Sequence, residues 1–309
     1  MTRGRLAPSP TGAQHLGNAR THLLAYWAAR QAGGELVLRI DDLDSPRVKS
    51  WAVDQAIEDL RWLGIDWDGP IARQSDHLDQ YEEALERLKN SADDPAYPCY
   101  CSRKEAEEAR SAPHESRFRG ELPPYPGTCR NFRQGDRVDD RDHCWRFRVS
   151  QRQWSVDDQV MGSITCAPAK DLGDFPITTK SGQASYQLAV VVDDCIQGVD
   201  QVVRGNDLIA STFRQLELQE RLGMTPPQYA HVALVRGPDG RRLAKRHGDT
   251  RLSFYRESGV APEQIVGWAA HSIGLIDRQE PSTAADLIHE FDWTKLDHED
   301  SHMDPETIF

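Results

Sequence analysis

Along the first ninety residues, hydrophobic positions follow two periods, and each period predicts a different element. Residues 5–7 and 34–40 are short extended runs bounded by proline, glycine or acidic residues, as strands usually are. Apolar residues recur at helical spacing before Gly33, and again over 50–63 and 78–88. Because strands and helices alternate, the pattern predicts a parallel sheet with helices on its faces.

Within the segment 50–63, four large apolar side chains are predicted to share one buried stripe of the helix, namely Trp51, Ile57, Leu60 and Leu63. Residues 90–150 then break the pattern, because they are rich in Pro, Arg, Asp and Cys. They have the character of an insertion.

Regular patterns return in the second half of the chain. The continuous apolar run YQLAVVVDD, residues 186–194, predicts a strand buried on both faces. A helix is predicted over 208–222. The final 65 residues or so after Lys245 are acidic and of helical character, with Trp268 and Trp293 as expected core anchors.

Composition narrows the possible classes of protein. The chain has 309 residues, enough to bury a core, and a net charge of −12, which disfavours nucleic-acid binding by bulk electrostatics. Between Arg103 and Arg152, however, twelve Lys and Arg stand against nine acidic residues. This sector is either a polyanion-binding surface or an ordinary solvated one. No apolar run approaches the ~20 residues of a membrane span, and MTRGRLAPSP has no apolar signal core, so we expect a cytoplasmic protein with no membrane partner.

Six cysteines, in a chain of this size without a signal peptide, favour free thiols or metal ligands over a disulfide framework. Cys99 and Cys101 form a Cys-x-Cys half-site, and Cys129 adds a third thiolate, which together suit zinc. The remaining three are predicted to be small buried residues: Cys144, Cys166 and Cys195.

The stretch RLAPSPTGAQHLGNAR, residues 5–20, is a loop that leads into a helix N-terminus. Free backbone N–H groups and the helix dipole favour an anion at such a place. Gly12 and Gly17 allow a ligand to approach the backbone, and His15 offers a hydrogen bond to a phosphate. A plain turn with an incidental histidine is the alternative. Residues 242–249, RLAKRHGD, form a short basic loop in which Lys245 offers a mobile cation for a triphosphate.

Taken together, these motifs resemble a known family. Residues 5–20 resemble the "HIGH" signature of glutamyl-type class I aminoacyl-tRNA synthetases, here His15-Leu16-Gly17-Asn18, and residues 242–246 resemble their "KMSKS" loop. LRIDDLDSPR, residues 38–47, and ASYQLAVVVDDCIQGVDQVVRGNDL, residues 184–208, resemble further segments of that family. The order and spacing of all four agree, and the resemblance covers about residues 1–250.

The resemblance implies an α/β fold with a doubly wound, Rossmann-like parallel sheet, an inserted acceptor-binding-like α/β subdomain and a short C-terminal helical segment. The expected parts are the first half of the catalytic domain at 1–95, the insertion with a zinc site at 96–180, the second half at 181–240, and the KMSKS-like loop with a helical region at 241–309. No anticodon-binding domain is expected.

The chemistry implied is activation of glutamate without tRNA. The carboxylate of glutamate attacks the α-phosphorus of ATP and pyrophosphate leaves, with Mg²⁺ expected beside ATP. His15 and Lys245 are the expected catalytic residues, because both stabilise charge on the phosphates, and with Gly17 they form the expected ATP site. Ala244 replaces a serine common in the family's loop. Losing that hydroxyl removes ~0.5–1.5 kcal/mol of hydrogen bonding, which slows the chemistry without abolishing it.

Carried over residue by residue, the glutamate pocket consists of Arg5, Ser9, Asp41, Tyr186 and Arg204. Two planar guanidinium groups suit two carboxylates, and Asp41 suits the ammonium group. Relatives carry glutamate at position 41, and a bridging water or a shifted backbone is expected to restore the reach of the shorter aspartate.

YPGTC, residues 125–129, resembles short members of the family whose zinc is held by three cysteines and a tyrosine. This implies one structural Zn²⁺ ligated by Cys99, Cys101, Tyr125 and Cys129, with His114 and Cys144 as alternatives for the fourth ligand.

The 65 or so residues after Lys245 are too few for a separate anticodon-reading module. The chain therefore resembles a short paralogue that attaches glutamate to queuosine in the anticodon loop of tRNA(Asp), and we expect a monomer whose basic stretch 103–152 contacts RNA phosphates. Three alternatives stay open: a discriminating glutamyl-tRNA synthetase that charges tRNA(Glu), a non-catalytic RNA-binding relic, and a nucleotidyltransferase of this architecture that uses another acid.

Overall fold

The computed structural model describes residues 1–43, 47–102, 104–105, 117–118, 121–136, 142–240, 243 and 249–304. Its centre is a five-stranded sheet in the order β10-β9-β1-β2-β3, in which every neighbouring pair is parallel. The strands are β1 (Arg3–Leu6), β2 (Glu35–Ile40), β3 (Ala72–Arg73), β9 (Gln201–Gly205) and β10 (Gln228–Val232).

From β1, the chain builds the sheet outward through β2 and β3, and later in the opposite direction through β9 and β10. The topological switch point therefore lies between β1 and β9. In open sheets of this kind, ligands bind beyond the carboxyl ends of the strands at that point. The predicted α/β fold with a parallel sheet is confirmed.

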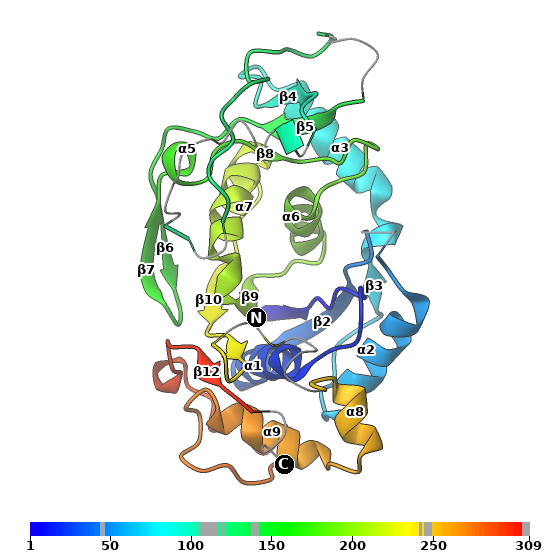
Figure 1. Ribbon diagram of the computed structural model, residues 1–309, viewed down its shortest axis with the longest axis vertical. Coiled ribbons are helices and arrows are strands. Elements are labelled where there is room, and N and C mark those ends of the chain that lie inside the picture. The colour runs from blue at the N-terminus through cyan, green and yellow to red at the C-terminus, as the bar shows by residue number, and fades with distance from the viewer. Residues whose placement is uncertain are drawn as a thin grey trace.

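Helices cover both faces of the sheet. Helix α1 (Leu16–Gln31) lies on one side, and α6 (Tyr186–Ile196) and α7 (Ile209–Leu222) lie on the other (Figure 1). Helix α1 is buried along most of its length because α9 (Pro262–His271) packs behind it. Trp27, fully buried, donates its indole N–H to the carbonyl of Ala284 over 2.8 Å.

The helices predicted over 50–63 and 78–88 are α2 (Ser50–Trp62) and α3 (Leu78–Lys89), so both predictions are confirmed to within one residue. The predicted stripe of α2 was wrong at Trp51, which is 51% exposed. The helix buries a face of smaller residues, Ala52, Val53, Ala56 and Leu60, because small side chains allow closer packing.

The strand predicted over 186–194 was wrong, because these residues form helix α6. Seven consecutive residues, 188–194, are buried, since α6 lies between α3 and α7 and is covered on nearly all sides. A helix surrounded in this way has no polar stripe, so its sequence lacks the helical period, and three consecutive valines imitate a buried strand.

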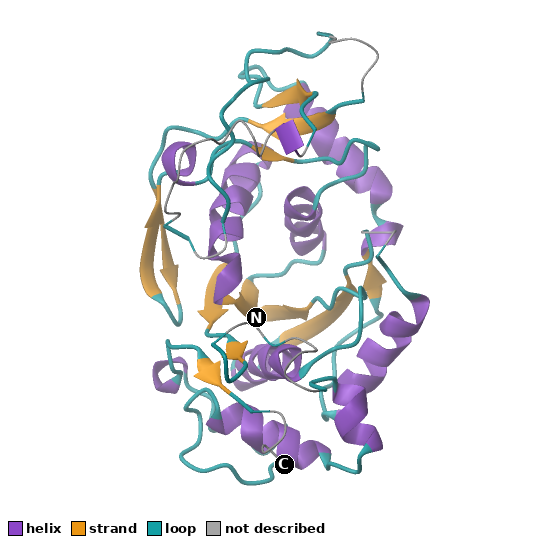
Figure 2. Ribbon diagram, in the orientation of Figure 1, coloured by secondary structure: helices purple, strands orange, loops and turns teal. Residues whose placement is uncertain are grey.

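The insertion contains a small antiparallel sheet of β4 (Ala96–Cys99), β5 (Cys144–Phe147) and β8 (Phe175–Pro176), and a hairpin of β6 (Trp154–Asp158) and β7 (Gly162–Cys166). Helix α5 (Pro168–Asp171) follows the hairpin (Figure 2). The hairpin packs against the central sheet, where the N–H of Gln159 donates to the carbonyl of Tyr229 over 3.0 Å.

After the central sheet come β11 (Val235–Arg236), α8 (Leu252–Glu257), α9 and β12 (Ser301–His302), which pairs in parallel with β11. Short 3₁₀ turns lie at Gln74–Asp76, Asn206–Leu208 and Trp293–Lys295. The prediction of a helical C-terminal region holds for α8 and α9 but was wrong for most of 272–304, where turns predominate. Trp268 is buried, as predicted, and Trp293 is half-buried and packs edge-on against Phe291.

Among the described residues, no helix combines the length and the apolar character that crossing a membrane requires.

Candidate active site and metal centre

A cavity of about 430 Å³ opens at the carboxyl ends of β1 and β9, at the switch point of the sheet. All five residues predicted for an amino-acid pocket line it, together with two of the three predicted for ATP: Arg5, Ser9, Asp41, Tyr186, Arg204, His15 and Gly17. The third, Lys245, lies outside the described residues, as does Ala244. Side chains separated by as many as 199 positions therefore meet around one hollow.

His15 is the N-cap of α1. Its Nδ1 accepts the backbone N–H of Asn18 over 3.3 Å, and the side-chain oxygen of Asn18 accepts the N–H of His15 over 3.1 Å. Because Nδ1 is an acceptor, the proton of the neutral ring lies on Nε2, which is the nitrogen able to donate to an anion. The helix dipole adds positive potential at the same place.

The turn before α1 is tied to the segment that follows the basic loop. His15 forms an isolated antiparallel bridge with Arg251, and the N–H of Leu16 donates to the carbonyl of Thr250 over 3.1 Å. The chain thus returns to His15 only a few residues after Lys245. This arrangement is compatible with both loops serving one ligand.

Beside the cavity, two arginines and three aspartates form a buried network. Arg39 is fully buried, and its guanidinium contacts Asp41 at 2.8 Å, Asp194 at 2.7 Å and Asp193 at 3.7 Å. Arg5 lies 3.6 Å from Asp194. Buried charges are tolerated only when they are paired, so this network fixes the positions of Arg5 and Asp41 at the cavity wall.

The pKa of Asp41, an acidic side chain in the cavity lining, is shifted by its surroundings. Burial raises its pKa to about 6, although Arg39 opposes the shift through its charge and hydrogen bond. Asp41 therefore remains ionised at neutral pH, and it already accepts a hydrogen bond from Arg39. Oδ1 of Asp41 accepts the hydrogen bond from Arg39, and the carboxylate can accept further hydrogen bonds from a substrate ammonium.

Arg204 is also buried, and it forms no direct ion pair with a carboxylate of the described residues. Its Nε donates to Nε2 of His231 over 3.2 Å and its Nη2 to the hydroxyl of Thr212 over 2.7 Å. Its Nη1 is buried and has no hydrogen-bond partner among the described residues. Because Arg204 lines the cavity and part of its guanidinium is unpaired, this residue is a candidate contact for the carboxylate of an anionic ligand.

Sequence reasoning missed three cavity or network residues. Arg39 lies within the family-like segment 38–47, but no pocket role was assigned to it from the sequence. Arg20 is 1% exposed and holds the cavity wall through the carbonyl of Ala233 over 2.5 Å. His22 lines the cavity, and burial lowers its pKa to about 4, so it is neutral at physiological pH.

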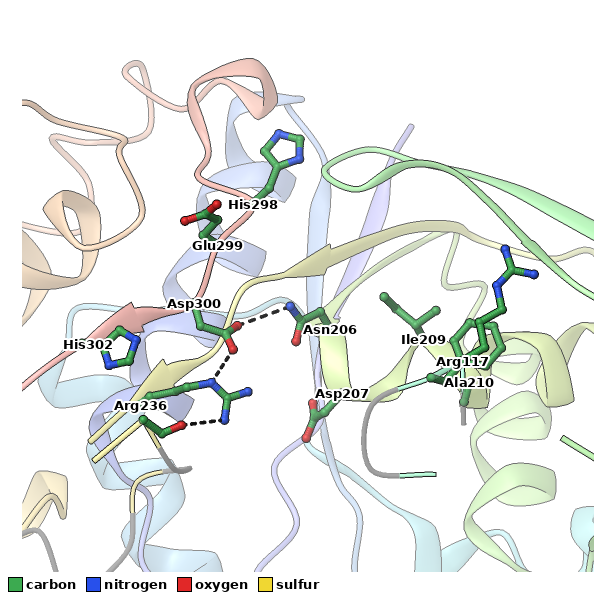
Figure 3. Close-up of a pocket in the computed structure, with 12 residues that line it drawn as sticks. Arg117, Asn206, Asp207, Ile209, Ala210, Arg236, His298, Glu299, Asp300 and His302 are labelled. Atoms are coloured by element: carbon green, nitrogen blue, oxygen red, sulfur yellow. Dashed lines mark hydrogen bonds and ion pairs between the residues drawn. The ribbon is translucent and has the colours of Figure 1, made fainter. Parts of the chain in front are cut away.

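A second hollow of about 600 Å³ adjoins the first, and Asp207 lines both. Its wall joins the start of α7 to the C-terminal segment, with Asn206 and Arg236 facing Asp300 (Figure 3). Asp300 accepts the N–H of Leu234 over 2.8 Å, the side-chain amide of Asn206 over 3.5 Å and a hydrogen bond from Arg236. Through these three hydrogen bonds, the carboxylate of Asp300 stabilises the wall between the two hollows.

In the insertion, the thiols of Cys99, Cys101 and Cys129 all lie within 4.8 Å of one another and could hold a metal ion. The hydroxyl of Tyr125 lies 3.5 Å from Cys99 Sγ and 3.4 Å from Cys101 Sγ. It also accepts the N–H of Cys129 over 3.0 Å. The structure therefore brings together all four residues that the sequence predicted around a metal.

Arg146 lies close to this cysteine cluster. Its guanidinium carbon is 3.8 Å from the centre of the Tyr125 ring. A hydrogen bond from Cys144 and the positive charge of Arg146 help to lower the pKa of the Cys99 thiol to about 4, although burial opposes the shift. A cation beside three thiols favours the thiolate form that metals require.

The expected burial of the three remaining cysteines needs one correction. Cys144 and Cys166 are buried as predicted, but Cys195 is exposed because it lies near the solvent end of α6. His114 lies outside the described residues. Several arginines of the basic stretch are paired with acidic side chains of the chain itself: Arg117 with Asp171, Arg130 with Asp174, Arg133 and Arg148 with Asp94, and Arg152 with Glu220.

A family model described as tRNA synthetases class I (E and Q), catalytic domain, matches residues 1–308. A Rhodopirellula baltica protein named glutamyl-Q tRNA(Asp) synthetase is 52% identical over 317 residues, which cover 97% of this chain and 96% of that protein. A Hydrogenobaculum protein named glutamate–tRNA ligase is 39% identical over 294 residues, which cover 91% of this chain and 62% of its own length.

Among solved structures, a glutamate tRNA ligase from Elizabethkingia meningosepticum, determined in complex with its amino acid, has a TM-score of 0.81 and 26% identity to this chain. The alignment covers 99% of this chain and 68% of that one.

Proposed function

This chain belongs to the class I tRNA synthetase family for glutamate and glutamine, and we propose that it is the ligase that activates glutamate with ATP and joins it to queuosine of tRNA(Asp). Similarity to the R. baltica glutamyl-Q tRNA(Asp) synthetase is higher, and covers both proteins more completely, than similarity to the Hydrogenobaculum glutamate–tRNA ligase. This difference favours queuosine over the end of tRNA(Glu) as the acceptor.

The cavity at the switch point is the observation that carries the proposal. Among its buried charged groups are two guanidinium groups, Arg5 and Arg204, and one carboxylate, Asp41, whereas the guanidinium of Arg20 is occupied by Ser301 and Ala233. Glutamate carries two carboxylates and one ammonium, so the number and signs of the charges match. The position of Arg204 in the cavity lining supports binding of one carboxylate, and Asp41 supports binding of the ammonium.

In the first step, a carboxylate oxygen of glutamate attacks the α-phosphorus of ATP, the bond to the bridging oxygen breaks, and pyrophosphate leaves. His15 Nε2–H and the N-terminus of α1 stabilise negative charge on the phosphates, and Gly17 leaves room beside the His15 ring, where an added Cβ would lie at 3.1 Å. Lys245 is proposed to do the same from the basic loop. Mg²⁺, bound to ATP, would neutralise phosphate charge.

In the second step, a hydroxyl on the cyclopentene ring of queuosine attacks the acyl carbon of glutamyl adenylate. An ester forms, AMP leaves, and the hydroxyl proton passes to solvent or to AMP. No nucleophile from the protein is required, because positioning and charge stabilisation are sufficient. The acceptor is proposed to lie in the anticodon loop, whose single-stranded bases can turn outward into a cavity. The working unit is proposed to be a monomer.

The cysteine cluster is proposed to hold one structural Zn²⁺ through Cys99, Cys101, Cys129 and Tyr125. The donor set suits zinc, which prefers four ligands in a tetrahedron, and Arg146 offsets the negative charge of the thiolates. When bound, the ion would cross-link the insertion, and no step of the reaction passes through it.

Two assays test the proposal. ATP–pyrophosphate exchange should depend on glutamate and proceed without tRNA, which separates this function from a non-catalytic relic and from an enzyme specific for another acid. Radiolabelled glutamate should then be transferred to tRNA(Asp) that contains queuosine, and mild base should release it. Transfer to tRNA(Glu) instead, or equal transfer to tRNA(Asp) without queuosine, would contradict the proposal.

A further inference from the structure

Behind Arg204, three buried side chains from different parts of the chain form a hydrogen-bonded relay. His231 Nε2 accepts from Arg204 Nε over 3.2 Å, and His231 Nδ1 lies 2.6 Å from the carboxylate of Asp158. Thr212 lies beside this line, 2.7 Å from Arg204 Nη2 and 2.9 Å from His231 Nε2. All four side chains are at most 5% exposed.

The relay admits one tautomer of His231. An ionised carboxylate can only accept hydrogen bonds. Nδ1 of His231 therefore carries the ring proton and donates the hydrogen bond to Asp158. Nε2 is then an acceptor, as its contact with the permanently protonated Arg204 requires. Burial lowers the pKa of His231, partly offset by Asp158, and this keeps the ring neutral.

Asp158 is itself fixed by the backbone. Its Oδ1 accepts the N–H groups of Val160 over 3.0 Å and Met161 over 2.9 Å, and both oxygens accept the N–H of His231 at 3.1 Å. Asp158 ends strand β6 of the insertion, whereas His231 lies on β10 of the catalytic sheet. The hairpin of the insertion is thus connected to the cavity.

The neutral ring of His231 also separates the positive charge of Arg204 from the negative charge of Asp158. Arg39 offers a contrast. Arg39 contacts three aspartates directly, so its positive charge is locally compensated. Arg204 contacts a histidine and a hydroxyl, and the nearest carboxylate of the relay lies on the far side of the imidazole. Within the part of the chain that the structure describes, no carboxylate therefore compensates the charge of Arg204 by direct contact, and its buried Nη1 has no hydrogen-bond partner.

We infer that Asp158, His231 and Thr212 are positioning residues that hold Arg204 as an uncompensated cation, and that this relay sets both the affinity for glutamate and the preference for glutamate over glutamine. The inference rests on the proposed function, because it requires that Arg204 binds a substrate carboxylate. A charged guanidinium prefers the carboxylate of glutamate to the neutral amide of glutamine.

Asp158→Asn tests the relay with little change of shape. The backbone N–H groups of Val160 and Met161 require an acceptor, so the amide oxygen takes the place of Oδ1 and the NH₂ faces Nδ1 of His231. The ring must then carry its proton on Nε2, where it opposes the N–H of Arg204. We expect KM for glutamate in ATP–pyrophosphate exchange to rise about tenfold or more, and KM for ATP to stay within about twofold.

The matched control is Asp157→Asn, which changes the neighbouring exposed carboxylate of the same strand. It should leave both KM values unchanged. Activity with glutamine relative to glutamate should increase in Asp158→Asn and not in Asp157→Asn.

A second pair keeps the test decisive if Asp158→Asn does not fold. Thr212→Val retains the shape of the side chain but removes the hydroxyl that contacts Arg204 and His231, and Thr212→Ser retains the hydroxyl. We expect Thr212→Val to raise KM for glutamate and Thr212→Ser to restore it.

Unchanged KM for glutamate in Asp158→Asn and Thr212→Val, or equal increases for both substrates, would overturn the relay. Absence of glutamate-dependent exchange in the unmodified protein would instead overturn the proposed function, so the two failures are distinguishable.

Discussion

Arg20 donates a hydrogen bond of 2.6 Å to the hydroxyl of Ser301, although the two residues stand 281 positions apart. The same guanidinium donates to the carbonyl of Ala233, so helix α1, the cavity wall before β11 and strand β12 meet at one buried cation. Burial lowers the pKa of Arg20 to about 10, which still leaves it charged at neutral pH. The C-terminal strand is therefore a structural part of the catalytic domain.

Replacement of Ser301 tests that connection. In Ser301→Ala, the buried Nη1 of Arg20 loses its shortest hydrogen bond and keeps only the contacts of 3.3 Å with Ser272. We therefore expect the free energy of unfolding to fall by about 1–3 kcal/mol. Urea denaturation measures the change, with Ser258→Ala as the control at an exposed position. Equal stability of the two variants would show that Ser301 does not anchor Arg20.

Replacing Arg39 is expected to destabilise the protein more than replacing Ser301. Arg39→Met leaves Asp41, Asp193 and Asp194 buried without their shared cation, and such a change typically costs about 3–5 kcal/mol. We expect a pronounced loss of folded protein in thermal melts and loss of glutamate-dependent exchange in what remains. Arg73→Met, at a half-exposed arginine 3.9 Å from Asp42, should change stability by less than about 1 kcal/mol. Similar melting temperatures for the two variants would contradict this role of Arg39.

Some features of the fold and of the cavity could be predicted from the sequence, and others could not. The parallel sheet was predictable because its strands and amphipathic helices are local patterns. The family resemblance placed Arg5, Asp41 and Arg204 in one pocket, and all three line the same cavity. Helix α6 was not predictable from periodicity, since neighbours cover it on nearly all sides and remove the polar stripe. Arg20 was also missed, because its partners lie more than 200 positions away.

The pKa of Asp41 predicts how glutamate binding depends on pH. Because burial raises this pKa to about 6, the carboxylate is charged above pH 6 and becomes neutral as the pH falls below it. The neutral form cannot pair with the substrate ammonium, so KM for glutamate should rise below pH 6, approaching about tenfold per pH unit. The effect on folding has the opposite sign: because the folded pKa of about 6 exceeds the unfolded value of 3.8, stability falls as the pH rises from 3.8 to about 6, and the loss is complete above that pH.

Exchange assays between pH 5 and 8 measure this dependence, with KM for ATP followed in parallel. Asp41→Asn should raise KM for glutamate at pH 7.5 and remove its rise below pH 6, whereas Asp42→Asn should keep that rise. His22, with a pKa of about 4, stays neutral throughout this range and does not contribute. Persistence of the rise in Asp41→Asn would assign the titration to another group.

The cysteine cluster yields a prediction about metal content. Zinc analysis of the purified protein should give about one ion per chain, and Cys101→Ser should give well below half of that, because a hydroxyl is a far weaker ligand than a thiolate. Cys195→Ser, at an exposed thiol outside the cluster, should keep the full content. Tyr125→Phe leaves three thiolates in place, so we expect weaker binding, seen as faster loss of zinc to a chelator. Because the ion is proposed to be structural, chelation should lower the melting temperature. Full zinc content in Cys101→Ser would place the metal elsewhere.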